Sequence, residues 1–271
     1  RSRANRLTQW VGIPNATDNQ SLYVDFRIAD RSGVGVSLFN DKNGNTNQKG
    51  AKFSFAHHLV LDYYSKQYLS FGLSFNINNF SIDVHNLQPG TFDPSITDNR
   101  AITNKNFDVG ILYRKKGFYT SLNANNILEK NIDKYGIYEP NLLLNFQLYS
   151  GYVMHNKANR SEIEPSVYYQ YFANDGRSST DFNIKYRKYD RYDDYYWAGL
   201  SYRFLNDQIG KPLNVGPMAG FKKSGFYFGY SYQVSLNELS AYNSGTHVVT
   251  IGFDFLQGIS NCPCTQSPVH D

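Results

Sequence analysis

The sequence predicts an all-β protein, a transmembrane antiparallel β-barrel of about 14 strands with short periplasmic turns and long extracellular loops. Apolar and polar residues alternate with period two along most of the chain, as in strands whose two faces meet different surroundings. The connections between the predicted strands alternate between short and long, as in bacterial outer-membrane barrels. The faces opposite the apolar ones carry charges, which suit a wet lumen better than a dry core.

The alternation defines each strand in turn, and no segment shows helical periodicity. Near the end of the chain, for example, Val249, Ile251 and Phe253 share one face, whereas Thr250 and Asp254 share the other. Each predicted strand is close to the roughly 9–11 residues that a tilted strand needs to cross a bilayer. The predicted strands are 4–11, 21–30, 33–41, 50–61, 67–77, 104–113, 116–126, 140–154, 162–174, 179–188, 193–205, 213–222, 224–234 and 246–256.

The connections indicate how the barrel is oriented. Those at 30–32, 115–116 and 223–224 are tight turns, and the intervening ones are longer and rich in Asn, Asp, Gly and Pro. The longer connections are 12–20, 42–49, 78–103, 127–139 and 235–245. Because an even number of strands puts both chain ends in the periplasm, we expect 78–103 outside the cell and the turn at 222–224 in the periplasm. We expect residues 1–256 to form one barrel and residues 257–271 to form a periplasmic tail.

The inward faces are polar. They carry Asp25, Arg27, Lys52, Asp108, Asn123, Asn145, Gln147, Glu164, Lys185, Arg187, Arg203 and Asp254. Such faces can line a wet or plugged lumen, so the apolar faces are expected to meet lipid. Closure of the sheet would satisfy the backbone groups in lipid. The alternative, a soluble β-sandwich or lipocalin-like barrel, would have to pack this inside-out pattern in water.

Composition excludes several classes of protein. The chain has 271 residues, a mean hydropathy of −0.53 and 18% charged residues, unlike a helical membrane protein or a charge-rich disordered chain. A net charge of +4 is too small to indicate nucleic-acid binding. The chain opens without a signal peptide, which fits either a processed or truncated chain or a cytosolic one. Cys262 and Cys264 lie in the tail, where we expect little chemistry.

We expect no cofactor, metal or catalytic site. Asp41, Asn43 and Asn45 have the spacing of a calcium loop, but Gly44 is misplaced for one, and Asn43-Gly44 favours a hairpin turn. His57 and His58 are adjacent in a predicted strand, so they point to opposite faces. An enzyme would need a nucleophile with an oriented base, and nothing local suggests one. A membrane-embedded enzyme is therefore a distant alternative.

Several segments along the chain have a familiar order and spacing. They are Gln9-Trp10-Val11-Gly12, Gly33-Val34-Gly35-Val36 with Phe39-Asn40-Asp41-Lys42-Asn43-Gly44, Ser54-Phe55-Ala56-His57-His58-Leu59, Phe107-Asp108-Val109-Gly110-Ile111 with Phe118-Tyr119, Tyr230-Ser231-Tyr232, and Leu239-Ser240-Ala241-Tyr242-Asn243-Ser244-Gly245-Thr246-His247. Together they resemble the PorP/SprF family of the type IX secretion system, outer-membrane proteins of Bacteroidetes. The chain departs from the family in having His57 where Tyr is usual, and in lacking the family's opening segment ahead of Arg1.

The resemblance implies a non-enzymatic protein in the outer membrane of a Gram-negative bacterium of the Bacteroidetes. It implies a partner as well, the C-terminal sorting domain of a large secreted surface protein such as a gliding adhesin. The protein would support secretion of that partner and its attachment at the cell surface. Periplasmic or other outer-membrane components of the secretion system are further expected partners. A general diffusion porin is the alternative function.

We expect the secreted partner to bind at 235–245 together with 78–103. The candidate residues are Asn237, Glu238, Leu239, Tyr242, Asn243 and Ser244. Tyr242 is the best anchor, because tyrosine is enriched among energetically dominant interface residues. The alternative is that Asn243-Ser244-Gly245 is only a turn and that Tyr242 folds into the barrel mouth or the aromatic girdle. At the short turns, Lys115, Lys116, Lys222 and Lys223 would contact either lipid head groups or a periplasmic partner.

Overall fold

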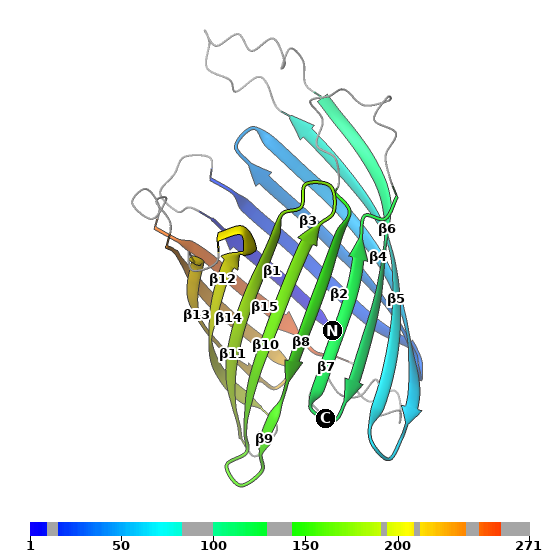
Figure 1. Cartoon of the computed structure of the whole chain (residues 1–271), viewed down its shortest axis with the longest axis vertical. Helices are drawn as coiled ribbons and strands as arrows, with labels where there is room; N and C mark the ends of the chain where they lie inside the picture. The colour runs from blue at the N-terminus through cyan, green and yellow to red at the C-terminus, as the bar shows by residue number, and fades with distance from the viewer. Residues whose placement is uncertain are drawn as a thin grey trace.

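The structure, a computed structural model, describes residues 1–9, 16–82, 100–128, 143–190, 194–208, 212–236 and 244–255. These residues form a closed antiparallel β-barrel of 14 strands, which confirms the predicted fold class (Figure 1). Fifteen strand segments are numbered, because β8 and β9 are two parts of one strand. They are β1 (Ser2–Thr8), β2 (Asp18–Ala29), β3 (Ser32–Asn43), β4 (Thr46–Asp62), β5 (Gln67–Ile82), β6 (Arg100–Lys115), β7 (Phe118–Asn125), β8 (Asn145–Tyr152), β9 (Met154–Asn156), β10 (Ser161–Phe172), β11 (Ser178–Tyr189), β12 (Tyr195–Leu205), β13 (Pro212–Lys223), β14 (Phe226–Ser235) and β15 (Thr246–Phe253).

The barrel closes where β1 pairs with β15, from Ser2 opposite Phe253 to Thr8 opposite His247. An ionic cluster reinforces this seam. The Asp254 carboxylate lies 2.7 Å from the Arg3 guanidinium and 3.0 Å from Lys222 Nζ, so one buried carboxylate links β1 and β13 to the end of β15. Closure gives the first and last strands of the chain hydrogen-bonding partners on both sides, which a sheet in lipid requires.

A proline explains why β8 and β9 are separate. The pairing of β10 with the preceding strand stops at Ser166 opposite Gly151 and resumes at Ile163 opposite Met154, in the same register. Pro165 lies between these two pairs and has no N–H to donate, so the ladder is interrupted there without a bulge. The single strand that the sequence predicts at 140–154 is thus present from Asn145 to Asn156, with one break.

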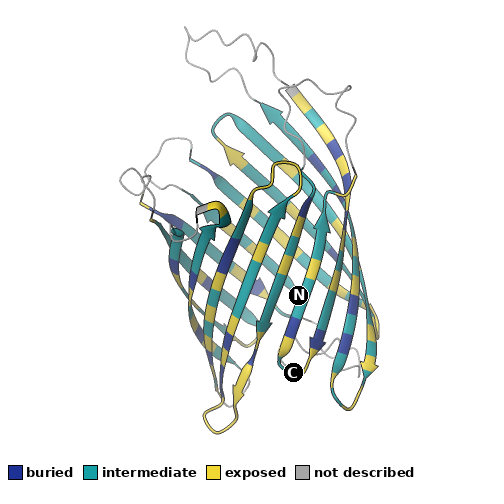
Figure 2. Ribbon diagram, in the orientation of Figure 1, coloured by how far each residue is buried: buried dark blue, intermediate teal, exposed yellow. Residues whose placement is uncertain are grey.

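Outward and inward side chains alternate along the barrel strands, and alternating bands of exposure are visible in Figure 2. On β15, Ile251 and Phe253 point outward and are 45% and 54% exposed. On β11, Ile184 points outward and is 50% exposed, whereas Arg187 points inward and is 2% exposed. Large apolar side chains therefore cover the outside and charged ones are buried inside, the reverse of a water-soluble protein. Among the described residues, no helix is long and apolar enough to cross a membrane.

The two ends of the barrel differ. One end, here called the short-turn end, has the turns 30–31, 63–66, 116–117, 157–160, 190–194 and 224–225. The other, here called the long-connection end, has the connections 9–17, 44–45, 83–99, 126–144, 173–177, 206–211 and 236–245. The prediction of a long connection at 42–49 is wrong. Asn43 pairs directly with Thr46 across a two-residue turn, and Gly44 supplies the positive φ of 58° that this turn needs.

The connection predicted at 78–103 is shorter in the structure, because the strands on both sides of it continue beyond the bilayer-crossing length. β4, β5 and β6 contain 17, 16 and 16 residues, so residues 78–82 and 100–103 belong to strands. We call the outer parts of four strands, residues 38–43, 46–52, 76–82 and 100–107, the hairpin extension. Its β5 and β6 ends stand above the other strands in Figure 1. The long-connection end thus carries a paired sheet as well as loops.

Cysteine labelling tests the expected orientation of these ends. In a chain with Cys262→Ser and Cys264→Ser, we expect Asn45→Cys at the long-connection end to react with an impermeant maleimide on whole cells. Ser224→Cys at the short-turn end should react only after the outer membrane is opened, because that end faces the periplasm in barrels of this kind. The opposite labelling pattern would reverse the orientation.

Candidate functional site

The lumen near the short-turn end holds a buried charge cluster on neighbouring strands. Arg187 on β11 makes ion pairs with Glu162 and Glu164 on β10. The Tyr119 hydroxyl donates to Glu164 at 2.6 Å, and the Tyr189 hydroxyl donates to Glu162 at 2.9 Å. The guanidinium therefore lies between two carboxylates that have further donors, the arrangement that buried charges require.

The same wall continues into an aromatic layer. Trp197 on β12 stacks on Tyr227 on β14, with ring centroids 6.3 Å apart and an interplanar angle of 10°. Lys185 Nζ lies 4.4 Å from the Trp197 ring, and the Arg3 guanidinium lies 5.0 Å from the Tyr227 ring. The layer lies flat because Gly220 stands beneath Trp197, where an added Cβ would come within 2.7 Å of Nε1. Each ring of the stack therefore contacts one cation, Trp197 that of Lys185 and Tyr227 that of Arg3.

Further ion pairs lie in the middle of the barrel and towards the long-connection end. Lys52 Nζ lies 2.6 Å from the Asp108 carboxylate, which also accepts from the Asn76 side-chain amide at 2.9 Å. On the opposite wall, Arg203 donates twice to Asp181, at 2.6 and 2.5 Å. The lumen is thus polar along its length, as the inward residues in the sequence predict.

Asparagine side chains hold the start of the 126–144 connection. Asn126 has a φ of 58°, and there the chain leaves the line of β7. The Asn106 amide accepts from the backbone N–H groups of Phe107 and Leu128, each at 2.8 Å, and donates to the Leu128 carbonyl at 3.1 Å. The Asn106 side chain therefore supplies hydrogen bonds at the edge of β6 where the pairing with β7 has ended. Asp108 assists by accepting the Asn126 N–H at 2.9 Å.

The far end of this connection is held in the same way. Asn145, which is buried, accepts from Asn125 at 3.1 Å and from Gln147 at 3.0 Å, and donates to the Leu143 carbonyl at 3.1 Å. Both ends of the connection are therefore fixed to the barrel rim by amide side chains.

The sequence decides the family. The family described as "Type IX secretion system membrane protein PorP/SprF" matches residues 1–253 of the chain. The chain belongs to the PorP/SprF family. The family and the fold together make it an outer-membrane β-barrel of the type IX secretion system, as the resemblance predicted. No curated relative matches the chain.

Several solved structures are similar to this chain. The CymD monoaromatic hydrocarbon channel has a TM-score of 0.52 and 11% identity, covering 92% of this chain and 85% of that one. BamA from Haemophilus ducreyi, lacking POTRA domains 1–3, has a TM-score of 0.46 and 8% identity, covering 93% and 70%. The β domain of the Bordetella autotransporter BrkA has a TM-score of 0.43 and 12% identity, covering 94% and 98%. At these identities the likeness concerns the fold alone.

Most of the residues predicted to bind the secreted partner lie outside the described residues. These are Asn237, Glu238, Leu239, Tyr242 and Asn243. Ser244 is described, and its carbonyl accepts from the Tyr232 hydroxyl at 2.9 Å, which fixes the start of β15 to β14. Leu236, just before the gap, is 48% exposed. Binding of the partner at this PorP/SprF loop stays a prediction.

The four predicted lysines of the PorP/SprF barrel do not share one environment. Lys115, Lys116 and Lys223 are exposed at the short-turn end. Lys222 points into the lumen and pairs with Asp254, so its first role is in the closing seam. The assignment of all four to lipid head groups or a periplasmic partner stays a prediction. Glu162, Trp197 and Tyr119, which carry much of the lumen chemistry, were not singled out from the sequence. Each is an even number of residues away from a predicted inward residue of its own strand, namely Glu164, Arg203 and Asn123, and that spacing was the signal that could have found them.

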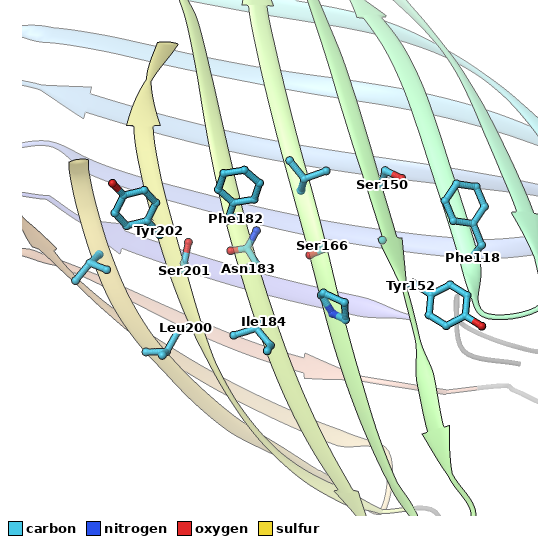
Figure 3. A pocket seen from close by; sticks show the side chains of 14 residues that line it. Phe118, Ser150, Tyr152, Ser166, Phe182, Asn183, Ile184, Leu200, Ser201 and Tyr202 are labelled. Atoms are coloured by element: carbon cyan, nitrogen blue, oxygen red, sulfur yellow. The ribbon is translucent and has the colours of Figure 1, made fainter. Parts of the chain in front are cut away.

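A groove lies on the lipid-facing wall of the PorP/SprF barrel, lined by residues of β7 to β13 (Figure 3). Its volume is about 660 Å³, and its lining includes Phe118, Tyr152, Phe182, Ile184 and Leu200. Ser150 and Gly151 on β8 and Ser166 on β10 also line it. Its outward side chains are mainly apolar, so in a membrane the groove faces lipid chains.

The described residues contain no group of three or more His, Cys, Asp or Glu side chains placed to hold a metal ion. His57 and His58 bond to different neighbours, Ser32 at 2.9 Å and Ser70 at 2.7 Å, because they lie on opposite faces of β4. At the long-connection end, the backbone N–H of Arg177 lowers the pKa of Asp175, which keeps a negative charge on the 173–177 turn.

Proposed function

We propose that this PorP/SprF barrel is a non-enzymatic outer-membrane receptor for the C-terminal sorting domain of a large secreted surface protein of gliding-adhesin type. It binds that domain at the long-connection end, which faces outward, and supports secretion of the protein and its attachment at the surface of a Bacteroidetes cell. Periplasmic or other outer-membrane components of the secretion system contact the short-turn end.

One observation carries this proposal beyond family membership, and it is the asymmetry of the two ends. The short-turn end is built of turns of two to five residues, whereas the other end carries the hairpin extension and the longest connections. A rigid paired platform surrounded by loops is a common way to present a binding surface. The side-chain amides of Asn106 and Asn145 hydrogen-bond to Leu128 and Leu143, near the two ends of the 126–144 connection. This connection therefore starts and ends at defined points on the barrel rim.

A general diffusion porin is the second candidate, because the lumen is lined with charges such as Lys52, Asp108 and Arg203. Two measurements separate the candidates. A receptor should co-purify from native membranes with one large secreted protein, identified by mass spectrometry. A porin should conduct ions in a planar bilayer at open-channel levels and purify without such a partner. The porin result without a partner would overturn the proposal.

Tyr242→Ala tests the predicted loop site. If Tyr242 anchors the secreted protein, its truncation should cost about 2 kcal/mol or more of binding free energy. The yield of the co-purified protein should then fall by at least about tenfold. The variant barrel should still insert and keep its heat-modifiable mobility on gels, which controls for folding. An unchanged yield from a correctly inserted variant would remove Tyr242 from the site.

A further inference from the structure

Within the described ranges, the hairpin extension has one edge that no strand covers. β6 pairs with β5 along its whole length, from Lys115 to Arg100, but its pairing with β7 begins only at Val109. One further hydrogen bond runs from the Ile127 N–H to the Phe107 carbonyl, at 3.0 Å. Among the described residues, no strand pairs with β6 on this side from Arg100 to Asn106. On the other side of the extension, β2 covers β3 up to Asp18 opposite Lys42. Of the strands that the structure describes in this extension, β6 therefore carries the open edge.

The direction of the backbone groups on this edge follows from strand geometry. The Phe107 carbonyl points towards the β7 side, because it accepts the Ile127 N–H there. In an antiparallel strand, the N–H and C=O of every second residue point to the same neighbour. The N–H and C=O groups of Ala101, Thr103 and Lys105 therefore face the open side. Those of Ile102 and Asn104 face β5. A continuous edge of three residues offers about six backbone hydrogen bonds, two for each residue.

Asn104 adds a second observation. It lies two residues from Asn106 on the same face of β6, it is only 4% exposed, and its side-chain oxygen has no hydrogen-bond partner. Asn106 shows what such a side chain does at this edge, since it bonds to both backbone groups of Leu128. A buried amide oxygen without a partner is unfavourable. A side-chain donor on the inner face of an added strand would satisfy Asn104.

We infer that an extended β-strand of the secreted protein's C-terminal domain adds to β6 along Ala101–Lys105, next to β5 and at the long-connection end. This inference rests on the proposed function and specifies how the partner is held. Unpaired N–H and C=O groups in strand geometry are complementary to another strand and to little else. The edge belongs to a four-stranded sheet, so ordering it costs little on binding. The side chains of Ala101, Thr103 and Lys105 are exposed on the outer face, out of the plane in which a new strand would lie.

Hydrogen exchange tests the inference at single-residue level. The barrel in lipid nanodiscs would be measured alone and with the recombinant C-terminal domain of the secreted protein identified by co-purification. The amides of Ala101, Thr103 and Lys105 should exchange fast in the free barrel and slow down at least about tenfold in the complex. The amides of Ile102 and Asn104 should be slow in both, because they already bond to β5.

Thr103→Pro is the matching variant. It removes the central N–H of the open edge without removing a bond to β5, and proline is tolerated at strand edges. We expect the Kd for the C-terminal domain to rise at least about tenfold. Thr103→Val is the control. It loses the bond from Asn79 to the threonine hydroxyl, as the proline variant does, but it keeps the backbone N–H, so Kd should stay within about twofold.

The outcomes are distinct. A complex in which the three edge amides still exchange fast would overturn the strand-addition inference and leave the proposed function standing. The edge amides could instead be protected in the free barrel, to a degree that rises with barrel concentration. That result would show edge-to-edge pairing of two copies of the barrel, and it would also overturn the strand-addition inference. If no complex forms with wild-type barrel, both the inference and the proposed function fail.

Discussion

Ile251→Arg should destabilise the barrel by about 2–4 kcal/mol, because it places a charge in the lipid-facing band of β15. Ile251 points outward, is 45% exposed and pairs with Ala4 in the closing seam. No water reaches this face in a bilayer, so the guanidinium would have to be desolvated or reach the interface along the wall. The measurement is the free energy of unfolding in urea, in lipid vesicles.

The neighbouring residue provides the control. Thr250→Arg puts the same side chain on the lumen side of the same strand, where water and polar groups can solvate it. Its cost should be well below that of Ile251→Arg. Phe253→Arg should fall between the two, because Phe253 lies at the short-turn end against Phe226, near the membrane interface. Equal costs for Ile251→Arg and Thr250→Arg would contradict the assignment of faces.

Arg187→Ala should cost about 3–5 kcal/mol, because it leaves the Glu162 and Glu164 carboxylates buried together without their cation. The two carboxylates belong to the same face of β10, so their mutual repulsion adds to the desolvation of each. Unfolding in urea measures this loss as well.

A combined variant separates the charge from the packing. Arg187→Met with Glu162→Gln and Glu164→Gln removes the three charges of these ion pairs together and nearly keeps the volume, while Lys185 opposite Glu164 keeps its contact with the Trp197 ring. We expect most of the stability lost in Arg187→Ala to return. A triple variant as unstable as Arg187→Ala would show that the shape of Arg187, rather than its charge, holds this part of the lumen.

The strand positions and the facing of side chains could be predicted because each residue's surroundings alternate strictly along a barrel strand. Ile251 beside Thr250, and Ile184 beside Lys185, show the rule at its clearest. The ends of the strands could not be predicted in the same way. Beyond the bilayer both faces of a strand meet water, so the alternation fades. The polar residues of 42–49 therefore resembled a loop, although Asn43 pairs with Thr46.

The candidate site was harder to predict. The polar lumen residues followed from their parity, but which of them meet depends on strand register. The register brings Glu162 opposite Arg187 and Glu164 opposite Lys185. The role of Asn106 could not be predicted from the sequence, because it depends on where the pairing between β6 and β7 ends. The loop residues around Tyr242 were chosen for composition, and they lie outside the described residues.

Direct binding is the closest test of the central claim that this PorP/SprF barrel is a receptor for a secreted protein's C-terminal domain. The purified barrel in lipid nanodiscs would be titrated with that domain alone, using the same secreted protein without the domain as the control ligand. We predict saturable binding of the domain and none of the control. No binding of the domain, together with stable ion conductance by the same preparation, would contradict the account.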